Sequence, residues 1–279
     1  MRIDGRVVAI TGGARGIGAA IATLAARQGA RVAIGDVDHD LAGRTAEQVG
    51  ALAVELDVTR RASWEAFVTG VERALGPIDV LVNNAGIMPI SRFIDEDPEI
   101  TDRQIEVNLA GVLTGCRVVV PGMLARRRGH LINIASQAGK AGFAGGVTYC
   151  ATKFGVVGLS HALDDELRDT PVSVTCVLPG LVNTELSYGL PMTPFAPLVQ
   201  PSEIAVAVIG AISRPRREVW VPRSGAVAIT IVRMLPPRLR ALLSRPVGAD
   251  DAMLRADQPA RAAYEERVRA PTPEKDPIA

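Results

Sequence analysis

Cysteine and histidine are both scarce in this 279-residue sequence, with three of each, and the scarcity excludes two kinds of site. Cys116, Cys150 and Cys176 lie far apart and form no CxxC pair, so we expect a reduced protein without a disulfide framework. Cys116 and Cys176 lie in apolar surroundings, which indicates small core residues. The histidines are scattered as well, so no metal site is expected.

The sequence also lacks a field of one charge and a long apolar run. The formal net charge is +1, with acids and bases interspersed, so nothing in the composition favours binding to nucleic acid. The apolar stretch Gly225–Leu235 is interrupted by Arg233 and is shorter than the roughly 20 residues that a membrane-spanning helix needs. No apolar leader precedes the strand-like run Val7–Ile10, so we expect no signal peptide and a cytoplasmic location.

Short β-branched runs alternate with longer stretches of helical periodicity, and hydrophobic residues make up 48% of the chain, enough for a large core. The expected strands are Arg6–Ile10, Arg31–Ile34, Leu52–Leu56, Val80–Asn83, His130–Ala135, Val172–Leu178 and Val219–Val221. The expected helices are Ile17–Gln28, Leu41–Val49, Trp64–Leu75, Arg103–Arg127, Val156–Arg168 and Glu203–Ile212. This alternation predicts an α/β protein, a doubly wound Rossmann-like parallel sheet of about seven strands with helices on both faces. Ligands of such sheets bind at the carboxyl ends of the strands.

Two regions depart from the alternation. Leu186–Pro201 contains four prolines, so we expect a loop or a broken helix there. The residues after Pro222 have no counterpart in the repeat of strand and helix. We therefore expect residues 1–222 to form one Rossmann-like domain and residues 223–279 to form a C-terminal extension.

A glycine-rich turn follows the first expected strand and opens a helix. Gly12 permits a tight turn, and Gly16 and Gly18 let the backbone approach a pyrophosphate that binds helix N–H groups. Asp36, at the end of the second strand, can accept hydrogen bonds from both adenosine ribose hydroxyls and repels a 2′-phosphate, which favours NAD over NADP. Arg15 favours NADP, because a basic residue in this turn suits a 2′-phosphate. We give Asp36 more weight, since an exposed arginine turns away at little cost.

Tyr149 and Lys153 lie four positions apart, so a helix places both side chains on one face. A free tyrosine has a pKa of about 10. The neighbouring ammonium lowers the pKa of Tyr149, and an oxidised nicotinamide adds a second positive charge with the same effect. Tyr149 can then take the proton of an alcohol as a general base, or return it to a carbonyl as a general acid.

Taken together, these segments resemble the short-chain dehydrogenase/reductase family over roughly Arg6 to Pro222. The resemblance is carried by Thr11–Gly18 (its TGxxxGxG loop), Asp57-Val58 (its adenine-side pair), Asn83–Gly86 (its NNAG), Tyr149–Lys153 (its YxxxK) and Pro179–Thr184 (its nicotinamide-side loop). It implies that the catalytic residues are Asn108, Ser136, Tyr149 and Lys153. The cofactor-binding residues that it implies are Gly12, Arg15, Gly16, Ile17, Gly18, Asp36, Asp57, Val58, Asn84, Ala85, Gly86, Tyr149, Lys153, Pro179, Gly180, Val182 and Thr184.

The family resemblance also implies a role for each catalytic side chain. Lys153 binds the nicotinamide ribose, Ser136 holds the substrate oxygen near Tyr149, and Asn108 supports a water that links Lys153 to solvent. The expected activity is hydride transfer between NAD and a secondary alcohol or ketone, or a primary alcohol or aldehyde. The alternatives are an NADPH-dependent carbonyl reductase and a dinucleotide-binding regulator that has lost catalysis; the intact catalytic set argues against the regulator.

The apolar side chains of Leu186–Pro201 predict a lipophilic substrate if this segment covers the cleft, although they can equally serve to pack the segment down. The apolar run Ser224–Leu235 and the basic amphipathic run Arg238–Leu243 must also be covered. The cleft, a second subunit and a membrane surface contacted through 224–245 are the three candidates, and packing on protein is the commonest outcome. We expect a homodimer built on the helices that carry Asn108 and Tyr149, or a homotetramer. The polar tail from Gly248 should be mobile beyond Ala270.

Overall fold

The computed structural model describes residues 3–191, 198–236 and 252–269. The expected helix Arg238–Leu243, the tail beyond Ala270 and part of the proline-rich segment lie outside these residues. The expectations for them stay predictions.

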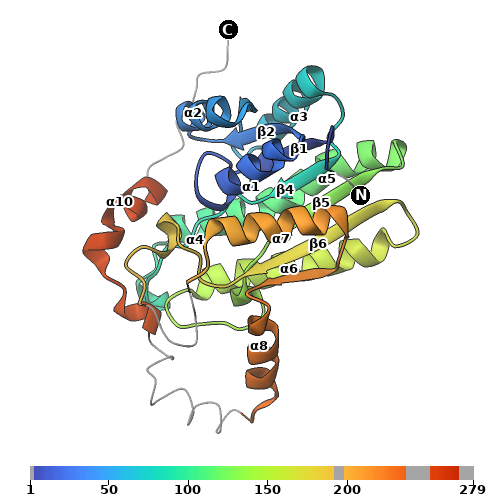
Figure 1. Cartoon of the computed structure of the whole chain (residues 1–279). Helices are drawn as coiled ribbons and strands as arrows, with labels where there is room; N and C mark the ends of the chain where they lie inside the picture. The colour runs from blue at the N-terminus through green and yellow to red at the C-terminus, as the bar shows by residue number, and fades with distance from the viewer. Residues whose placement is uncertain (1–2, 192–197, 237–251, 270–279) are drawn as a thin grey trace.

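A single seven-stranded sheet forms the centre of the protein (Figure 1), and all of its strand pairs are parallel. The strand order is β3-β2-β1-β4-β5-β6-β7, which is the doubly wound arrangement predicted from the alternation. The strands are β1 (Val7–Thr11), β2 (Arg31–Asp36), β3 (Leu52–Glu55), β4 (Val80–Asn83), β5 (Gly129–Ile134), β6 (Val172–Pro179) and β7 (Glu218–Val221).

Helices cover both faces of this sheet. The α-helices are α1 (Gly16–Arg27), α2 (His39–Val49), α3 (Arg61–Leu75), α4 (Pro98–Ile105), α5 (Gly111–Ala125), α6 (Val147–Glu166), α7 (Pro201–Ser213), α8 (Ser224–Met234) and α10 (Gln258–Arg269). A π-helical turn, η2 (Glu106–Ala110), joins α4 to α5, and short 3-10 turns lie at η1 (Phe93–Asp95), η3 (Gln137–Gly139), η4 (Glu185–Ser187) and η6 (Ala252–Arg255).

Two helices differ most from their expected bounds, and both of these differences concern the polar site. Helix α6 begins at Val147, nine residues before the expected start at Val156, because the buried polar residues Tyr149 and Lys153 interrupt the apolar periodicity. The helix expected over Arg103–Arg127 begins at Pro98, where the side chain of the preceding aspartate caps it, and is divided by η2.

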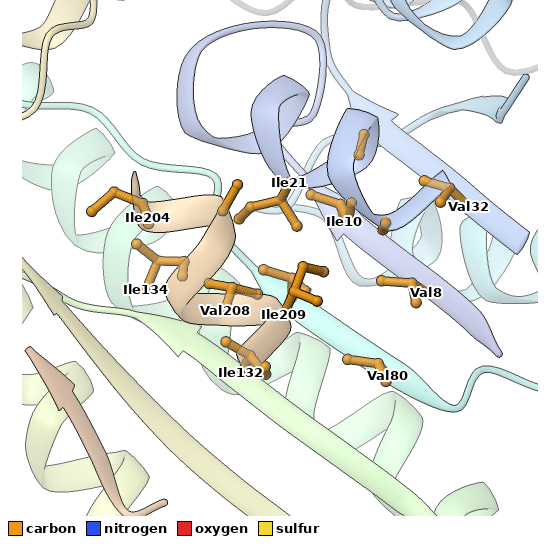
Figure 2. Close-up of a cluster of buried hydrophobic side chains, with 14 of the residues drawn as sticks. Val8, Ile10, Ile21, Val32, Val80, Ile132, Ile134, Ile204, Val208 and Ile209 are labelled. Carbon is orange, nitrogen blue, oxygen red and sulfur yellow. The ribbon is translucent and has the colours of Figure 1, made fainter. Parts of the chain in front are cut away.

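The core has two layers because successive side chains of each strand point to opposite faces of the sheet. On β1, Val8 and Ile10 pack with Ile21 of α1 and Val208 of α7 (Figure 2). Val7 and Ala9 pack on the other side, with side chains of α3, α5 and α6. The expected coverage of both faces is therefore confirmed.

The stretch Pro98–Ala125 is the one helical segment of the described residues that is long and apolar enough, by length and composition, to cross a membrane. Four of its side chains, Val112, Cys116, Val119 and Met123, belong to the core beneath the sheet. Core helices of globular proteins commonly meet the same criteria.

The extension after β7 contributes two helices that differ in their contacts. Helix α8 leaves the end of β7 and projects from the body (Figure 1), and its Val227, Ile231 and Met234 are exposed. Helix α10 instead lies beside the loops at the carboxyl edge of the sheet and buries Tyr264 and Val268.

Candidate active site

The carboxyl ends of the central strands open into one cavity of about 750 Å³. All of the residues predicted to bind the cofactor or to take part in catalysis line this cavity, except Gly18 and Asn108. These two lie directly behind the wall, Gly18 in the glycine-rich turn and Asn108 in the π-helical turn. The parallel sheet therefore brings together segments that are up to about 170 residues apart in the chain.

The glycine-rich turn has the backbone that a dinucleotide requires. Gly12 and Gly16 have φ of 63° and 56°, a region that side chains disfavour. A Cβ at Gly18 would lie 2.3 Å from the carbonyl oxygen of Gly12, so any other residue would force the turn open. These glycines leave backbone N–H groups accessible at the start of α1, where a pyrophosphate fits.

A hydrogen-bonded bridge joins this turn to the loop after β4. The Asn84 amide donates to the carbonyl oxygens of Thr11 and Gly12, both at 2.9 Å. The Thr11 hydroxyl accepts in return from the backbone N–H groups of Asn84 and Ala85, both at 3.0 Å. The sequence motif assigns Thr11 no separate role, and the structure shows that it connects these two segments.

The end of β2 carries the acidic group expected beside the adenosine ribose. The Asp36 carboxylate accepts from the N–H groups of Ala14 at 3.0 Å and Asp38 at 3.1 Å. Burial raises the pKa of Asp36, and these two hydrogen bonds oppose the rise. Arg15 is engaged by two carboxylates, that of Asp38 and that of Glu185 at 3.3 Å.

The adenine-side pair lies next to this group. Asp57 accepts from the N–H group and hydroxyl of Thr59 at 2.9 and 2.7 Å, and the carbonyl of Val58 accepts from the indole of Trp64 at 3.0 Å. Asp57 and Val58 both line the cavity.

Tyr149, Lys153 and Ser136 lie together at the inner end of the cavity. The Lys153 ammonium is 5.7 Å from the centroid of the Tyr149 ring and donates to the carbonyl of Ile134 at 3.0 Å. Ser136 follows β5, and its hydroxyl accepts from the N–H group of Ala138 at 3.1 Å. A hydrogen bond also joins Ser136 to Tyr149.

Burial is the main influence on the two titratable side chains of this group. It raises the pKa of Tyr149 to about 12, against which the hydrogen bond from Ser136 acts, and it lowers the pKa of Lys153 to about 8. The expectation that Lys153 lowers the pKa of Tyr149 is therefore wrong for the protein without cofactor, because burial raises this pKa instead. A further positive charge near Tyr149 is needed before its phenolate is favoured. An oxidised nicotinamide carries such a charge, and the cavity joins this group to the glycine-rich turn.

Asn108 is fully buried in the π-helical turn and ties the loop after β4 in place. Its side chain accepts from the N–H group of Ile87 and donates to the carbonyl of Ile87, both at 2.8 Å, and it donates to the hydroxyl of Thr152 at 3.3 Å. A Cβ at Gly86 would lie 3.2 Å from Asn108 Oδ1 and 3.6 Å from Lys153 Nζ, so both polar groups border the same space.

The loop after β6 supplies a further side of the cavity and touches the glycine-rich turn, where Thr184 lies close to Gly16. Pro179, Gly180, Val182 and Thr184 all line the cavity, and Val182 forms an isolated parallel bridge with Val199. Further along the loop, Leu186 and Leu190 both line the cavity. Both belong to a small apolar cluster that contains Tyr149 and Met88, and Leu186 also packs against a second cluster. These leucines therefore serve both of the uses that the sequence left open, covering the cleft and packing the segment down.

Several lining residues were not identified from the sequence. Met253, Tyr264, Arg267 and Val268 come from the polar tail, yet all four face the same cavity. The one available signal is the spacing of four between Tyr264 and Val268, which any polar surface helix can show.

Comparisons with known proteins agree with this geometry. The family model described as short chain dehydrogenase matches residues 6–192. The sequence is 40% identical over 188 residues to the sorbitol dehydrogenase of Cereibacter sphaeroides, covering 66% of this chain and 73% of that protein. It is 37% identical over 220 residues to the 2-(S)-hydroxypropyl-CoM dehydrogenase 3 of Xanthobacter autotrophicus, covering 77% and 86%. It is 38% identical over 216 residues to the 3-alpha-(or 20-beta)-hydroxysteroid dehydrogenase of Mycobacterium tuberculosis, covering 75% and 82%.

The buried charge at Lys153 leads to a prediction about stability. Lys153→Met keeps the length of the side chain and removes an ammonium that burial disfavours. We expect the variant to have a higher free energy of unfolding at pH 7, on the order of 1–3 kcal/mol. Because the pKa of Lys153 is about 8 when folded and its ordinary value is 10.5, the unfolded chain binds more protons between these values. The contribution of Lys153 to stability therefore rises with pH across this window.

Urea unfolding of both proteins at pH 7 and pH 10 measures the effect. The difference between them should be largest at pH 7 and should shrink toward pH 10, since the other titrating groups are common to both proteins. A variant that is less stable than the parent at pH 7 would show that the hydrogen bond to the Ile134 carbonyl outweighs the cost of burying the charge.

Proposed function

This chain belongs to the short-chain dehydrogenase family, and on that premise we propose that it is an NAD-dependent dehydrogenase of lipophilic secondary alcohols, with Tyr149 as the general acid and base. Family membership makes it an oxidoreductase that uses a nicotinamide cofactor and acts on a carbon bearing a hydroxyl or carbonyl group. The finer assignments of cofactor, substrate and catalytic roles are the proposal.

The observation that carries the proposal is the position of Tyr149, Lys153 and Ser136 in the cavity that the glycine-rich turn opens. Ser136 and Tyr149 hold the substrate oxygen between them. Tyr149 takes the hydroxyl proton in oxidation and returns it in reduction, and the Lys153 ammonium favours the phenolate state. When bound, the nicotinamide supplies the hydride acceptor or donor. Asn108 positions the loop after β4 and borders the space beside Lys153, through which a proton can pass to water.

The charges at the end of β2 support NAD rather than NADP. Asp36 lines the cavity where the adenosine ribose belongs, and Asp38 and Glu185 add two further carboxylates close by. Arg15 is the residue that favours the NADPH-dependent alternative, but its guanidinium is already paired with Asp38 and Glu185. A 2′-phosphate would have to displace these partners and lie beside Asp36.

Asp36→Ala should weaken the preference for NAD, because it removes both the ribose acceptor and the repulsive charge. We expect the ratio of the NAD and NADP dissociation constants to change by about tenfold or more, which corresponds to about 1.4 kcal/mol. Fluorescence titration with each dinucleotide measures the ratio. Glu47→Ala, an exposed acid-to-alanine change on α2, is the matched control and should leave the ratio unchanged. Equal or tighter binding of NADP by the unaltered protein would refute the assignment of NAD.

Tyr149→Phe should abolish most of the turnover, because it keeps the ring and removes the oxygen that transfers the proton. General acid and base catalysis contributes about 10²–10⁴-fold to rates, and we expect a loss of kcat in that range. NAD binding, measured by the same titration, should stay within about twofold of the parent value, since one hydrogen bond at most is removed. A variant that oxidises alcohols at a rate close to that of the parent would show that another group transfers the proton.

Apolar side chains surround the inner end of the cavity and support a lipophilic substrate. Met88, Phe143, Leu186, Leu190 and Met253 all line this region. Desolvating a polyol among such side chains would leave its hydroxyl groups unpaired, whereas a hydrocarbon skeleton gains from burial.

Self-association is the last part of the proposal, and it rests on helix α6. Exposed apolar or small residues form one continuous stripe along this helix, at Val147, Ala151, Phe154, Gly158 and Ala162. The helical stretch Pro98–Ala125, which packs against α6, is also apolar, and 39% of its most apolar window is buried within the chain. Two copies that bring these stripes together would form a homodimer on the helices that carry the site.

Phe154→Glu should separate such a dimer, because it places a charge at the centre of the stripe, where Phe154 is 43% exposed. Sedimentation velocity should show the parent protein as a dimer or tetramer and the variant as a smaller species. Ala66→Glu, an exposed site on α3, introduces the same charge elsewhere and should leave the assembly intact. A parent protein that sediments as a monomer would refute the proposal.

A further inference from the structure

Helix α10 lies outside residues 6–192, the part that the family model matches, yet it is firmly attached to the active-site loops. Three of its side chains, Arg261, Tyr264 and Val268, are buried and share one face of the helix. The spacing of three and four residues places them in a row. The other residues of the helix are mostly exposed, so this row supplies the buried contacts of the helix with the protein.

Arg261 is the most unusual member of the row, because its side chain is completely buried. Its Nη1 atom donates to the carbonyls of Leu186 and Tyr188, both at 3.0 Å, and its Nη2 atom donates to the carbonyl of Met88 at 2.8 Å. The Nε atom donates to Glu265 at 3.1 Å, which balances the charge. One guanidinium therefore joins the loop after β4 to the loop after β6.

Tyr264 completes the attachment. Its hydroxyl accepts from the N–H group of Met88 at 2.7 Å, so α10 binds both backbone groups of Met88. Its ring lies 5.3 Å from the Arg261 guanidinium carbon. The loop after β6 also packs closely against the start of α10 at Gly189, since a Cβ at this position would lie 2.6 Å from the carbonyl oxygen of Asp257.

The same face of α10 forms part of the cavity that holds Tyr149. Tyr264 and Val268 line it, together with Met88 and Leu186, which the Arg261 and Tyr264 bonds hold in place. A wall held by a buried guanidinium that makes four hydrogen bonds is costly to displace, because each lost bond would leave a buried polar group without a partner.

We infer that α10 is a fixed wall of the substrate site, that Tyr264 and Val268 are specificity-determining residues that limit the size of the alcohol admitted to Tyr149, and that Arg261 is the positioning residue of this wall. The inference rests on the proposed function, since it assigns the walls of the site in which Tyr149 acts. On this inference, the two side chains select substrates by the bulk of the hydrocarbon next to the carbon that bears the hydroxyl group.

The size limit is tested with two secondary alcohols that share their chemistry and differ in bulk, cyclohexanol and cyclododecanol. For Tyr264→Ala and Val268→Ala, we expect the ratio of kcat/KM for the large alcohol to that for the small one to rise by about tenfold or more, the scale at which apolar pockets discriminate by size. Glu266→Ala, on the exposed face of the same helix, should leave the ratio unchanged.

The positioning role is tested at Arg261. Arg261→Met should raise KM for both alcohols with a smaller change in kcat, because the loops that shape the site lose their common anchor while Tyr149 and Lys153 remain. Arg261→Lys should not restore KM, since an ammonium cannot match the fork that reaches three carbonyls. Arg269→Met, an exposed arginine on the same helix, is the matched control.

Failure of this inference and failure of the proposed function give different results. If the parent protein oxidises both alcohols with NAD, and Tyr264→Ala and Val268→Ala leave the ratio unchanged, the wall is refuted and the proposed function stands. If no alcohol is oxidised, the proposed function fails. For variants that do not fold, hydrogen exchange of the parent protein decides: adding cyclohexanol to its NADH complex should slow exchange in residues 258–269, and unchanged exchange there would overturn the inference.

Discussion

Parallel pairing of all seven strands is the constraint on which the active site depends. It places every strand's carboxyl end at one edge, and the central position of β1 beside β4 creates the crevice in which the glycine-rich turn and the loop after β4 face each other. Thr11 and Asn84 join these two segments by hydrogen bonds. The catalytic group then lies one strand farther along the same edge, on β5 and α6.

Most of the polar groups around the cavity are paired with backbone rather than with one another. Asn108 binds both backbone groups of Ile87, Lys153 binds the carbonyl of Ile134, and Arg261 binds three carbonyls. Buried polar side chains are tolerated when such partners are present, and the loops gain definite positions from them. Lys153 differs from the other two because burial lowers its pKa, so its charged form is disfavoured there despite the bond to the Ile134 carbonyl.

The extension after β7 divides into two parts with different surroundings. Helix α8 projects from the body and keeps Val227, Ile231 and Met234 exposed, although its Ile229 lines the cavity, while α10 lies against the active-site loops. The three candidate coverings concern residues 224–245; of the described residues in that segment, Ile229 lines the cleft of the same chain, and α10 borders the same cleft. The ion pairs of Glu185 with Arg15 and with Arg267 further connect the cofactor side of the cavity to this helix.

The sequence by itself determined the alternation of strands and helices, the strand centres, the glycine-rich turn, and the pairing of Tyr149 with Lys153. Each of these depends on residues within about one turn or one strand of each other, and local periodicity reports such relations directly. The early start of α6 escaped prediction because polar residues of the site replace the apolar ones that mark a helix.

Only the tertiary structure decided which carboxylates pair with Arg15 and where α10 packs. Arg15 meets Glu185 across 170 residues, and Arg261 meets Met88 across 173. No periodic pattern connects residues at such separations. In the sequence, Arg261 is one arginine in a polar tail, and only the loops that the sheet brings beside it supply the carbonyls that make its burial possible.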